Sequence, residues 1–147
     1  MAYNPAFSAY KTTGVKTATQ GKLIVMLYDE AIKQLKTASS LYREDGHVEA
    51  SNIERMSKCV QKAQEIITEL MASLKMDAEG GKEIAENLLS LYLYFNKELM
   101  NAMINKDKSK IDFVCKMMNE LRGAWAQAET MTTTHPSDLG PSVSIRG

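Results

Sequence analysis

Histidine and carboxylate side chains are the residues of this sequence that could support metal or proton-transfer chemistry. The chain contains only two histidines, His47 and His135. A di-iron site in a helical bundle needs Glu on two helices and a Glu-x-x-His pair on each of the other two. His47 follows a cluster of turn formers and His135 lies in a Thr-, Ser- and Pro-rich stretch, so we expect neither on a helix. Metal ligation, haem ligation and phosphotransfer on a helical histidine are therefore disfavoured.

The other candidate catalytic groups also lack a supporting pattern. Glutamates occur beside Lys and Arg or outside the apolar stripes, as on a solvated helix face; they are Glu65, Glu69, Glu83, Glu86, Glu98 and Glu120. No GxxxxGK[ST], GxGxxG or GxSxG motif is present. Cys59 and Cys115 have no second Cys or His at ligand spacing, which predicts buried free thiols in a reducing cytosol. We therefore predict a protein without enzymatic activity, metal or cofactor.

Bulk composition narrows the class of protein further. The 147 residues fit one domain, and 44% of them are hydrophobic, as in a chain that folds. Eighteen basic and eighteen acidic residues balance, which makes nucleic acid an unexpected partner. No apolar run approaches the length of a membrane span, and the N-terminus lacks the features of a secretory signal. These features predict a cytosolic protein that does not insert into membranes.

The positions of the helix breakers predict four long helices. The three prolines, Pro5, Pro136 and Pro141, leave residues 6–135 free of the strongest breaker. Clusters of turn formers interrupt this stretch at residues 44–46, 77–81 and 105–107. Thr19 is a candidate N-cap for the first helical segment, and Asp107 or Ser109 is one for the fourth.

Apolar residues recur in each segment at alternating spacings of three and four, which predicts one buried stripe per helix. The four stripes are Ile24, Tyr28, Ala31, Leu35, Ala38 and Tyr42; Ile53, Met56, Val60, Ala63, Ile67, Leu70 and Leu74; Ala85, Leu88, Tyr92, Phe95, Leu99 and Ala102; and Ile111, Val114, Met118, Leu121, Trp125 and Ala128. This spacing and the short connections are typical of an all-α, antiparallel up-down four-helix bundle, which we predict over residues 19–131.

The two ends of the chain differ from this core. Residues 1–18 carry Tyr3, Phe7, Tyr10 and Val15 among small and polar residues, and we expect this N-terminal segment to pack across the bundle. Residues 132–147 are rich in Thr, Ser, Pro and Gly without periodic apolar residues, which predicts a disordered tail.

The third helical segment carries more apolar residues than one core stripe requires. The run from Leu88 to Phe95 is apolar around most of the helix, although a surface helix normally keeps one side polar. Flexible methionines, which suit groove-type binding surfaces, accompany this run. A second copy of the chain, the N-terminal segment or an amphipathic helix of another protein could cover the surplus. One alternative is therefore a homo-oligomeric structural bundle that has no client.

Several blocks in the sequence, in a fixed order, resemble the FliS family of flagellin export chaperones. The blocks are Tyr10; Val15-Lys16-Thr17-Ala18; Gly21 to Asp29 with Ala31-Ile32; Ala63 to Leu70; Gly80-Gly81 with Ile84-Ala85 and Asn87-Leu88; Leu91-Tyr92 with Tyr94; and Leu121-Arg122 with Ala124-Trp125.

The resemblance implies a cytosolic chaperone that binds the C-terminal region of unfolded flagellin, prevents its premature polymerisation and assists its delivery to the flagellar type III export apparatus. It also implies that the N-terminal segment rearranges when flagellin binds, and that Tyr10 contributes to recognition of the export gate. The predicted partner-binding residues include Tyr10 and Val15 of the N-terminal segment. Those that we predict for the groove itself are Ile66, Met71, Leu89, Leu93, Tyr94, Met100, Phe113 and Met117.

Overall fold

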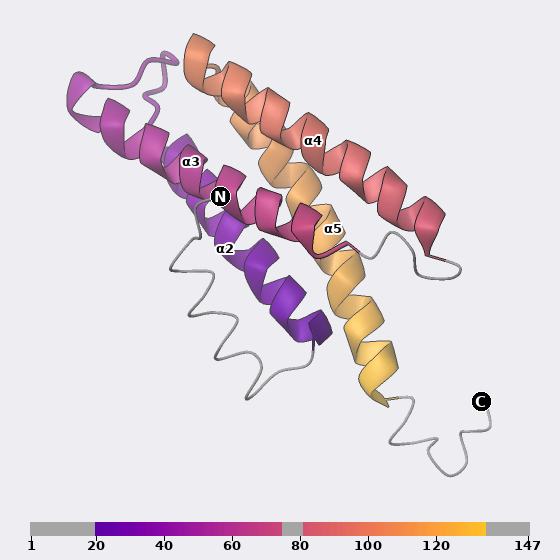
Figure 1. Cartoon of the computed structure of the whole chain (residues 1–147). Coiled ribbons are helices and arrows are strands. Elements are labelled where there is room, and N and C mark those ends of the chain that lie inside the picture. Colours follow the sequence, from indigo (N-terminus) through magenta and orange to yellow (C-terminus); the bar gives the residue numbers. More distant parts are fainter. Residues whose placement is uncertain (1–19, 75–80, 135–147) are drawn as a thin grey trace.

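The part of the chain that the structure describes forms four antiparallel α-helices. The computed structural model describes residues 20–74 and 81–134. Its helices are α2 (Gln20–Ser40), α3 (Ala50–Ala72), α4 (Lys82–Asn105) and α5 (Lys108–Thr134). Each helix runs opposite to the next one along the chain (Figure 1). The predicted all-α four-helix bundle is confirmed.

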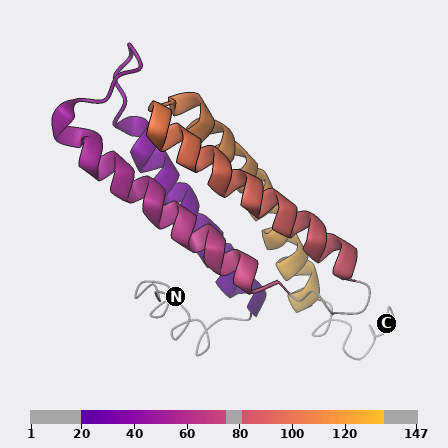
Figure 2. The same cartoon turned by 45° about the horizontal axis from the view of Figure 1, so that its top comes forward.

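The helices form a closed ring in chain order. Helix α2 packs against α3 and α5, and α4 packs against the same two helices, so α2 and α4 lie on opposite sides of the bundle. Figure 2 shows α3 and α4 side by side in front of α2 and α5. The contacts of α2 with its two neighbours are more extensive than those of α4. Helix α4 is therefore the less firmly packed member of the ring.

Helix α5 ends later than the sequence predicted. It continues to Thr134, so residues 132–134 are helical and the predicted disordered tail begins too early. Thr and Ser have only modestly unfavourable helix propensities, so a helix that is already formed can extend through them until a proline follows. The predicted N-terminal segment, residues 1–18, and the tail from residue 135 lie outside the described residues.

The turn between α2 and α3 forms where turn formers cluster. Gly46 has a φ of 87°, a conformation that favours glycine. The Arg43 N–H donates to the His47 carbonyl at 2.7 Å, and Tyr42 and Val48 form a β-bridge across the turn. His47 is exposed in this turn, as predicted, and lies away from the bundle core.

The connection between α4 and α5 is very short. Lys106 ends α4 in the left-handed conformation, with a φ of 51°, and its N–H donates to the Ala102 carbonyl. Asp107 then caps α5, because its Oδ1 accepts from the Ser109 N–H at 3.0 Å and from the Ser109 hydroxyl at 2.6 Å. The predicted cap at Asp107 is confirmed.

The predicted stripes form the core with few exceptions. Its largest fully buried side chains include Tyr28, Tyr92 and Phe95. The Tyr28 and Tyr92 hydroxyls hydrogen-bond to each other, which joins α2 to α4 through the centre of the bundle. Ala128 is exposed rather than buried because it lies in the last turns of α5, where less of the neighbouring helices remains to cover it. Cys59 is buried as expected, but Cys115 is only half-buried.

Candidate partner-binding surface

The exposed large hydrophobic side chains gather on one side of the bundle. Among the described side chains they all belong to α4 or α5; they are Ile84, Leu93, Tyr94, Met100, Ile104 and Phe113. Monomeric proteins rarely leave a contiguous apolar patch uncovered without a functional reason. We therefore describe this side in detail.

One line of apolar residues follows the edge of α4 that faces α3. Leu89, Leu93, Met100 and Ile104 are spaced by four, seven and four residues, which places them on one stripe of the helix. Leu93, Met100 and Ile104 expose 55%, 49% and 67% of their surface. We call these four residues the α4 strip.

Contacts with α3 fix the position of the α4 strip. Asn96 lies within the line, and its Nδ2 donates to the Thr68 hydroxyl of α3 at 3.2 Å. The Gln64 side-chain amide of α3 donates to the Asn96 carbonyl at 3.2 Å. Met71 follows Thr68 by three residues on the same edge of α3 and is half-buried. The strip therefore lies along the seam between α3 and α4.

A second apolar feature lies on the other edge of α4, beside α5. Tyr94 and Phe113 pack edge-to-face with their ring centroids 6.2 Å apart, although both remain partly exposed. Next to them, the Lys110 ammonium of α5 contacts the Glu98 carboxylate of α4 at 3.1 Å. Met117 follows Phe113 by one helical turn and is half-buried. Tyr94 and Phe113 form what we call the aromatic pair.

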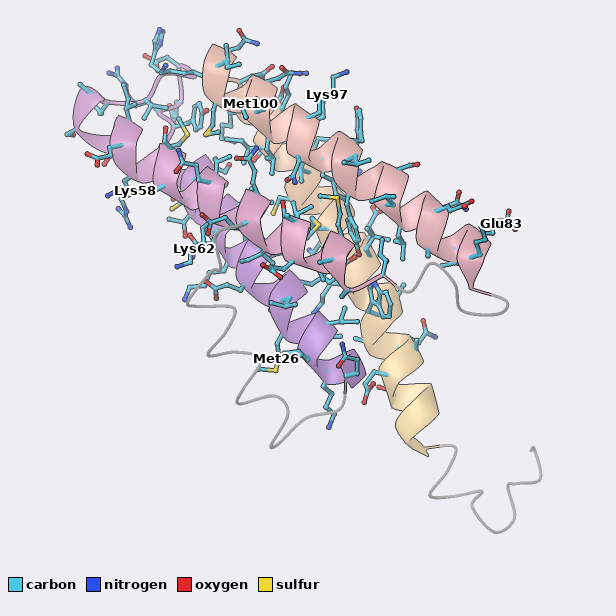
Figure 3. All side chains as sticks on the ribbon, viewed as in Figure 1. Met26, Lys58, Lys62, Glu83, Lys97 and Met100 are labelled. Atoms are coloured by element: carbon cyan, nitrogen blue, oxygen red, sulfur yellow. The ribbon has the colours of Figure 1, made fainter. Side chains whose placement is uncertain are left out.

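A polar ridge separates the α4 strip from the aromatic pair. The sequence instead predicted that helix α4 is apolar around most of its circumference. Glu83, Glu86, Ser90, Lys97 and Asn101 are spaced by three, four, seven and four residues along the outer side of α4. Figure 3 shows Glu83 and Lys97 extending away from this side. Helix α4 thus has two apolar edges and a polar crest.

An apolar cavity of about 260 Å³ opens at the end of the bundle where α4 begins. Ile24, Leu74, Leu88 and Trp125 line its walls, and Ile84, with 63% of its surface exposed, also contributes. Tyr92, whose hydroxyl pairs with that of Tyr28, also lines the cavity. Burial raises the pKa of both tyrosines, so these hydroxyls stay neutral at physiological pH.

Most of the described groove residues predicted from the sequence fall on these two features. Leu89, Leu93 and Met100 belong to the α4 strip, and Met71 lies on the α3 edge of the same seam. Tyr94 and Phe113 form the aromatic pair, with Met117 beside them. Tyr10 and Val15 lie outside the described residues.

Ile66 is the exception among the predicted groove residues. Only 3% of its surface is exposed, and it belongs to the central apolar cluster. The buried face of α3 is wider than a single three-four stripe and includes both Ile66 and Ile67. Ile66 is therefore a core residue and is left out of the proposed groove. Conversely, the sequence did not predict that Ile84 and Ile104 belong to the exposed apolar surface, although Ile104 follows Met100 by one helical turn.

Catalytic or metal-binding geometry is not evident in residues 20–74 and 81–134. This part of the chain contains no cluster of three His, Cys, Asp or Glu side chains that could hold a metal ion. Burial raises the pKa of the Cys115 thiol, which disfavours the reactive thiolate. Over the same residues, no helix is long and apolar enough to cross a membrane.

Within the described residues, fold and surface together define a helical bundle with large apolar side chains exposed on α4 and α5. The family described as "Flagellar protein FliS" matches residues 2–132. The flagellar secretion chaperone FliS of Bacillus subtilis strain 168 is 30% identical over 128 residues, covering 87% of this chain and 89% of the relative. The corresponding chaperone of Salmonella typhimurium is 33% identical over 115 residues, covering 78% and 80%. The chain belongs to the FliS family, in which these relatives are named as secretion chaperones.

Proposed function

We propose that this protein is a cytosolic export chaperone that binds the C-terminal region of unfolded flagellin. By holding this region it would prevent premature polymerisation and assist delivery to the flagellar type III export apparatus. The named FliS relatives, which are flagellar secretion chaperones, support this assignment. The observation that carries the proposal is the α4 strip, a line of exposed apolar side chains beside the α3–α4 seam.

The seam offers what an amphipathic helix needs. Such a helix presents its apolar residues along one stripe, and the residues of the α4 strip, spaced by four, seven and four, likewise form a single stripe that could lie against it. Each Å² of apolar surface that the client buries contributes about 25 cal/mol, which offsets the entropy it loses on becoming helical. Met71 and Met100 have flexible side chains that can adjust to different apolar partners. The aromatic pair would hold a second piece of the client on the α5 side.

The N-terminal residues enter the proposal through the family resemblance alone. Tyr10 and Val15 would contact the client or the flagellar export gate, with Tyr10 contributing to recognition of the gate. Binding the client requires no catalytic group, metal or cofactor.

A calorimetric titration with the last few dozen residues of flagellin from the same cell tests the proposal. We expect a one-to-one complex with the wild-type chain. Leu93→Glu combined with Met100→Glu should weaken binding by about 2–4 kcal/mol, because the change places charge at central apolar anchors. Circular dichroism should show an unchanged bundle, since both side chains are about half exposed.

Ser90→Glu combined with Asn101→Glu is the matched control. It adds the same two charges to the same helix but on the polar ridge, so binding should stay close to that of the wild type. Equal weakening by both variants would mean that charge alone, and not the α4 strip, determines the affinity. A stable dimer that ignores the flagellin peptide in sedimentation would instead support the homo-oligomeric bundle.

A further inference from the structure

A shallow groove of different chemistry lies on the side of α3 that faces α2. This groove of about 490 Å³ runs between α2 and α3, and we call it the α2/α3 groove. Gln34 of α2 lines one wall, and the charged residues on the α3 wall are Glu54, Arg55, Lys58 and Lys62. Figure 3 shows Lys58 and Lys62 extending from α3 on the side away from α4.

Two of these cations have no acidic partner among the described residues. Lys58 pairs with Glu54 at 3.3 Å, and both side chains are widely exposed. Arg55 and Lys62 form no ion pair with any residue in the described part of the chain. They are seven residues apart, so they project about 10 Å apart along the same face of α3. The groove thus presents two uncompensated positive charges two helical turns apart.

The positive charge continues across α2. A second groove, of about 440 Å³, lies between α2 and α5 and is lined by Lys33 and Lys36. Neither lysine forms an ion pair within residues 20–74 and 81–134, whereas Arg122 in the same groove contacts Asp29 at 2.7 Å. The whole chain is formally neutral, so this local excess is a feature of one surface and not of the composition.

We propose that the α2/α3 groove is a second docking surface, which binds an acidic segment of another protein through Arg55 and Lys62. A helix with carboxylates three, four and seven residues apart matches the spacing of these two cations. This inference goes beyond the proposed chaperone function, because it assigns a partner to a different surface. Helix α3 borders both sites, but the groove lies on its α2 side and the seam on its α4 side, so a chain occupied by flagellin at the seam could bind the acidic partner at the same time.

The terminal segments of this chain are not acidic enough to be the segment that binds in the α2/α3 groove. Residues 1–19 contain no Asp or Glu, and residues 135–147 contain only Asp138. The acidic turn between α2 and α3 of a second copy is also a poor match. In that turn Arg43 already contacts the carboxylates of Asp45 and Glu49, at 3.1 and 3.3 Å. An acidic segment of a different protein therefore suits the groove better.

The test uses the full chain and a designed probe. The probe is a helical peptide of about 15 residues with glutamates three, four and seven apart on one face. A control peptide carries glutamine at those positions. In ¹⁵N-labelled protein, the acidic peptide should shift the amide resonances around Gln34, Arg55 and Lys62, and added salt should weaken the effect. The glutamine peptide should leave these resonances in place. Shifts spread over all exposed lysines, or equal binding of both peptides, would overturn the proposal.

Charge-reversal variants distinguish specific binding at the α2/α3 groove from a general effect of the protein's net charge. Arg55→Glu with Lys62→Glu should weaken binding of the acidic peptide roughly tenfold or more. The control Lys82→Glu with Lys97→Glu makes the same change on exposed positions of α4, and it should keep nearly full affinity. If both variants lost affinity for the acidic peptide equally, net charge alone would explain the binding, and the assignment to the α2/α3 groove would be wrong. A wild-type dimer that is lost only in the groove variant would identify a second copy as the occupant, which also contradicts the proposal.

Flagellin binding provides the independent readout. The groove variant should bind the flagellin peptide as the wild type does, because neither substitution touches the α4 strip. If flagellin binding fails in the wild type while the acidic peptide still binds, the chaperone function is wrong and the second surface stands. The two hypotheses can therefore fail separately.

Discussion

Helices α2 and α4 occupy equivalent places on opposite sides of one ring, yet they expose different surfaces. Helix α2 packs more extensively on its two neighbours than α4 does. Its outer side carries charged residues such as Lys33 and Lys36, whereas both edges of α4 expose large apolar side chains such as Leu93 and Tyr94. The comparison shows that α2 is the more extensively packed helix and α4 the one with the larger exposed apolar surface, which matches the proposed division of labour in which α4 binds the client.

Removing one leucine from each helix should show the largest difference between them. Leu35 of α2 is fully buried, whereas Leu93 of α4 is 55% exposed. Leu35→Ala should lower the free energy of unfolding by about 2–5 kcal/mol, because it removes transfer free energy and leaves a cavity. Leu93→Ala should change it by no more than about 0.5 kcal/mol. Urea unfolding followed by circular dichroism measures both values.

Flagellin binding should reverse the ranking of these two variants. Leu93→Ala should bind the peptide more weakly, and Leu35→Ala should bind it normally under conditions in which it remains folded. A large loss of stability in Leu93→Ala would show that α4 contributes to the core as much as α2, and the proposed division of labour would be wrong.

The hydrogen bond between Tyr28 and Tyr92 should have a smaller effect, since it joins the two helices at a single point. Tyr28→Phe should cost about 1–2 kcal/mol, because it leaves the buried Tyr92 hydroxyl with one partner fewer. The double variant Tyr28→Phe/Tyr92→Phe should cost less than the sum of the single changes. Denaturant unfolding of the four chains gives the coupling energy. Additive costs would show that the hydroxyl pair does not couple α2 to α4.

Alkaline pH offers a second readout of the same pair. Burial raises the folded-state pKa of both tyrosines above the unfolded value of about 10. The stability that they contribute is therefore fully present below pH 10 and is lost as the pH rises further. This loss should be smaller in the double Phe variant.

The fold followed from the sequence because its signal is repeated. Three-four spacing in four segments identified core residues such as Tyr28, Phe95 and Val114, and turn formers located the connections. The assumption of one buried stripe per helix did not identify the full width of the core face of α3. Ile66 sits beside Ile67 on the buried face of α3, whose core side is wider than one stripe, and helical phase alone does not reveal that width.

The candidate site was only partly predictable for a related reason. Surplus apolar residues pointed to α4, but their exposure depends on the lengths and positions of neighbouring helices. Ile84 and Ile104 lie near the two ends of α4, where fewer neighbouring side chains can cover them. The polar ridge was also missed, because Ser90 and Lys97 stand within or next to an apolar run and mark the outer side only once the packing is known.

The Asp107 cap should have the smallest effect, and it tests the connection that joins α4 to α5. Asp107→Ala should cost about 1 kcal/mol at neutral pH, because it removes the acceptor for the Ser109 N–H. The hydrogen bond from the Ser109 hydroxyl lowers the pKa of the Asp107 carboxyl below its usual value. Its charged form therefore contributes stability above about pH 4, and that contribution is lost as the pH falls through the folded-state pKa. Asp107→Asn keeps an acceptor without the charge, so it should retain most of the stability but not the acid dependence. Unfolding curves that show Asp107→Ala and the wild type equally separated at pH 7 and at acidic pH would contradict a charged cap.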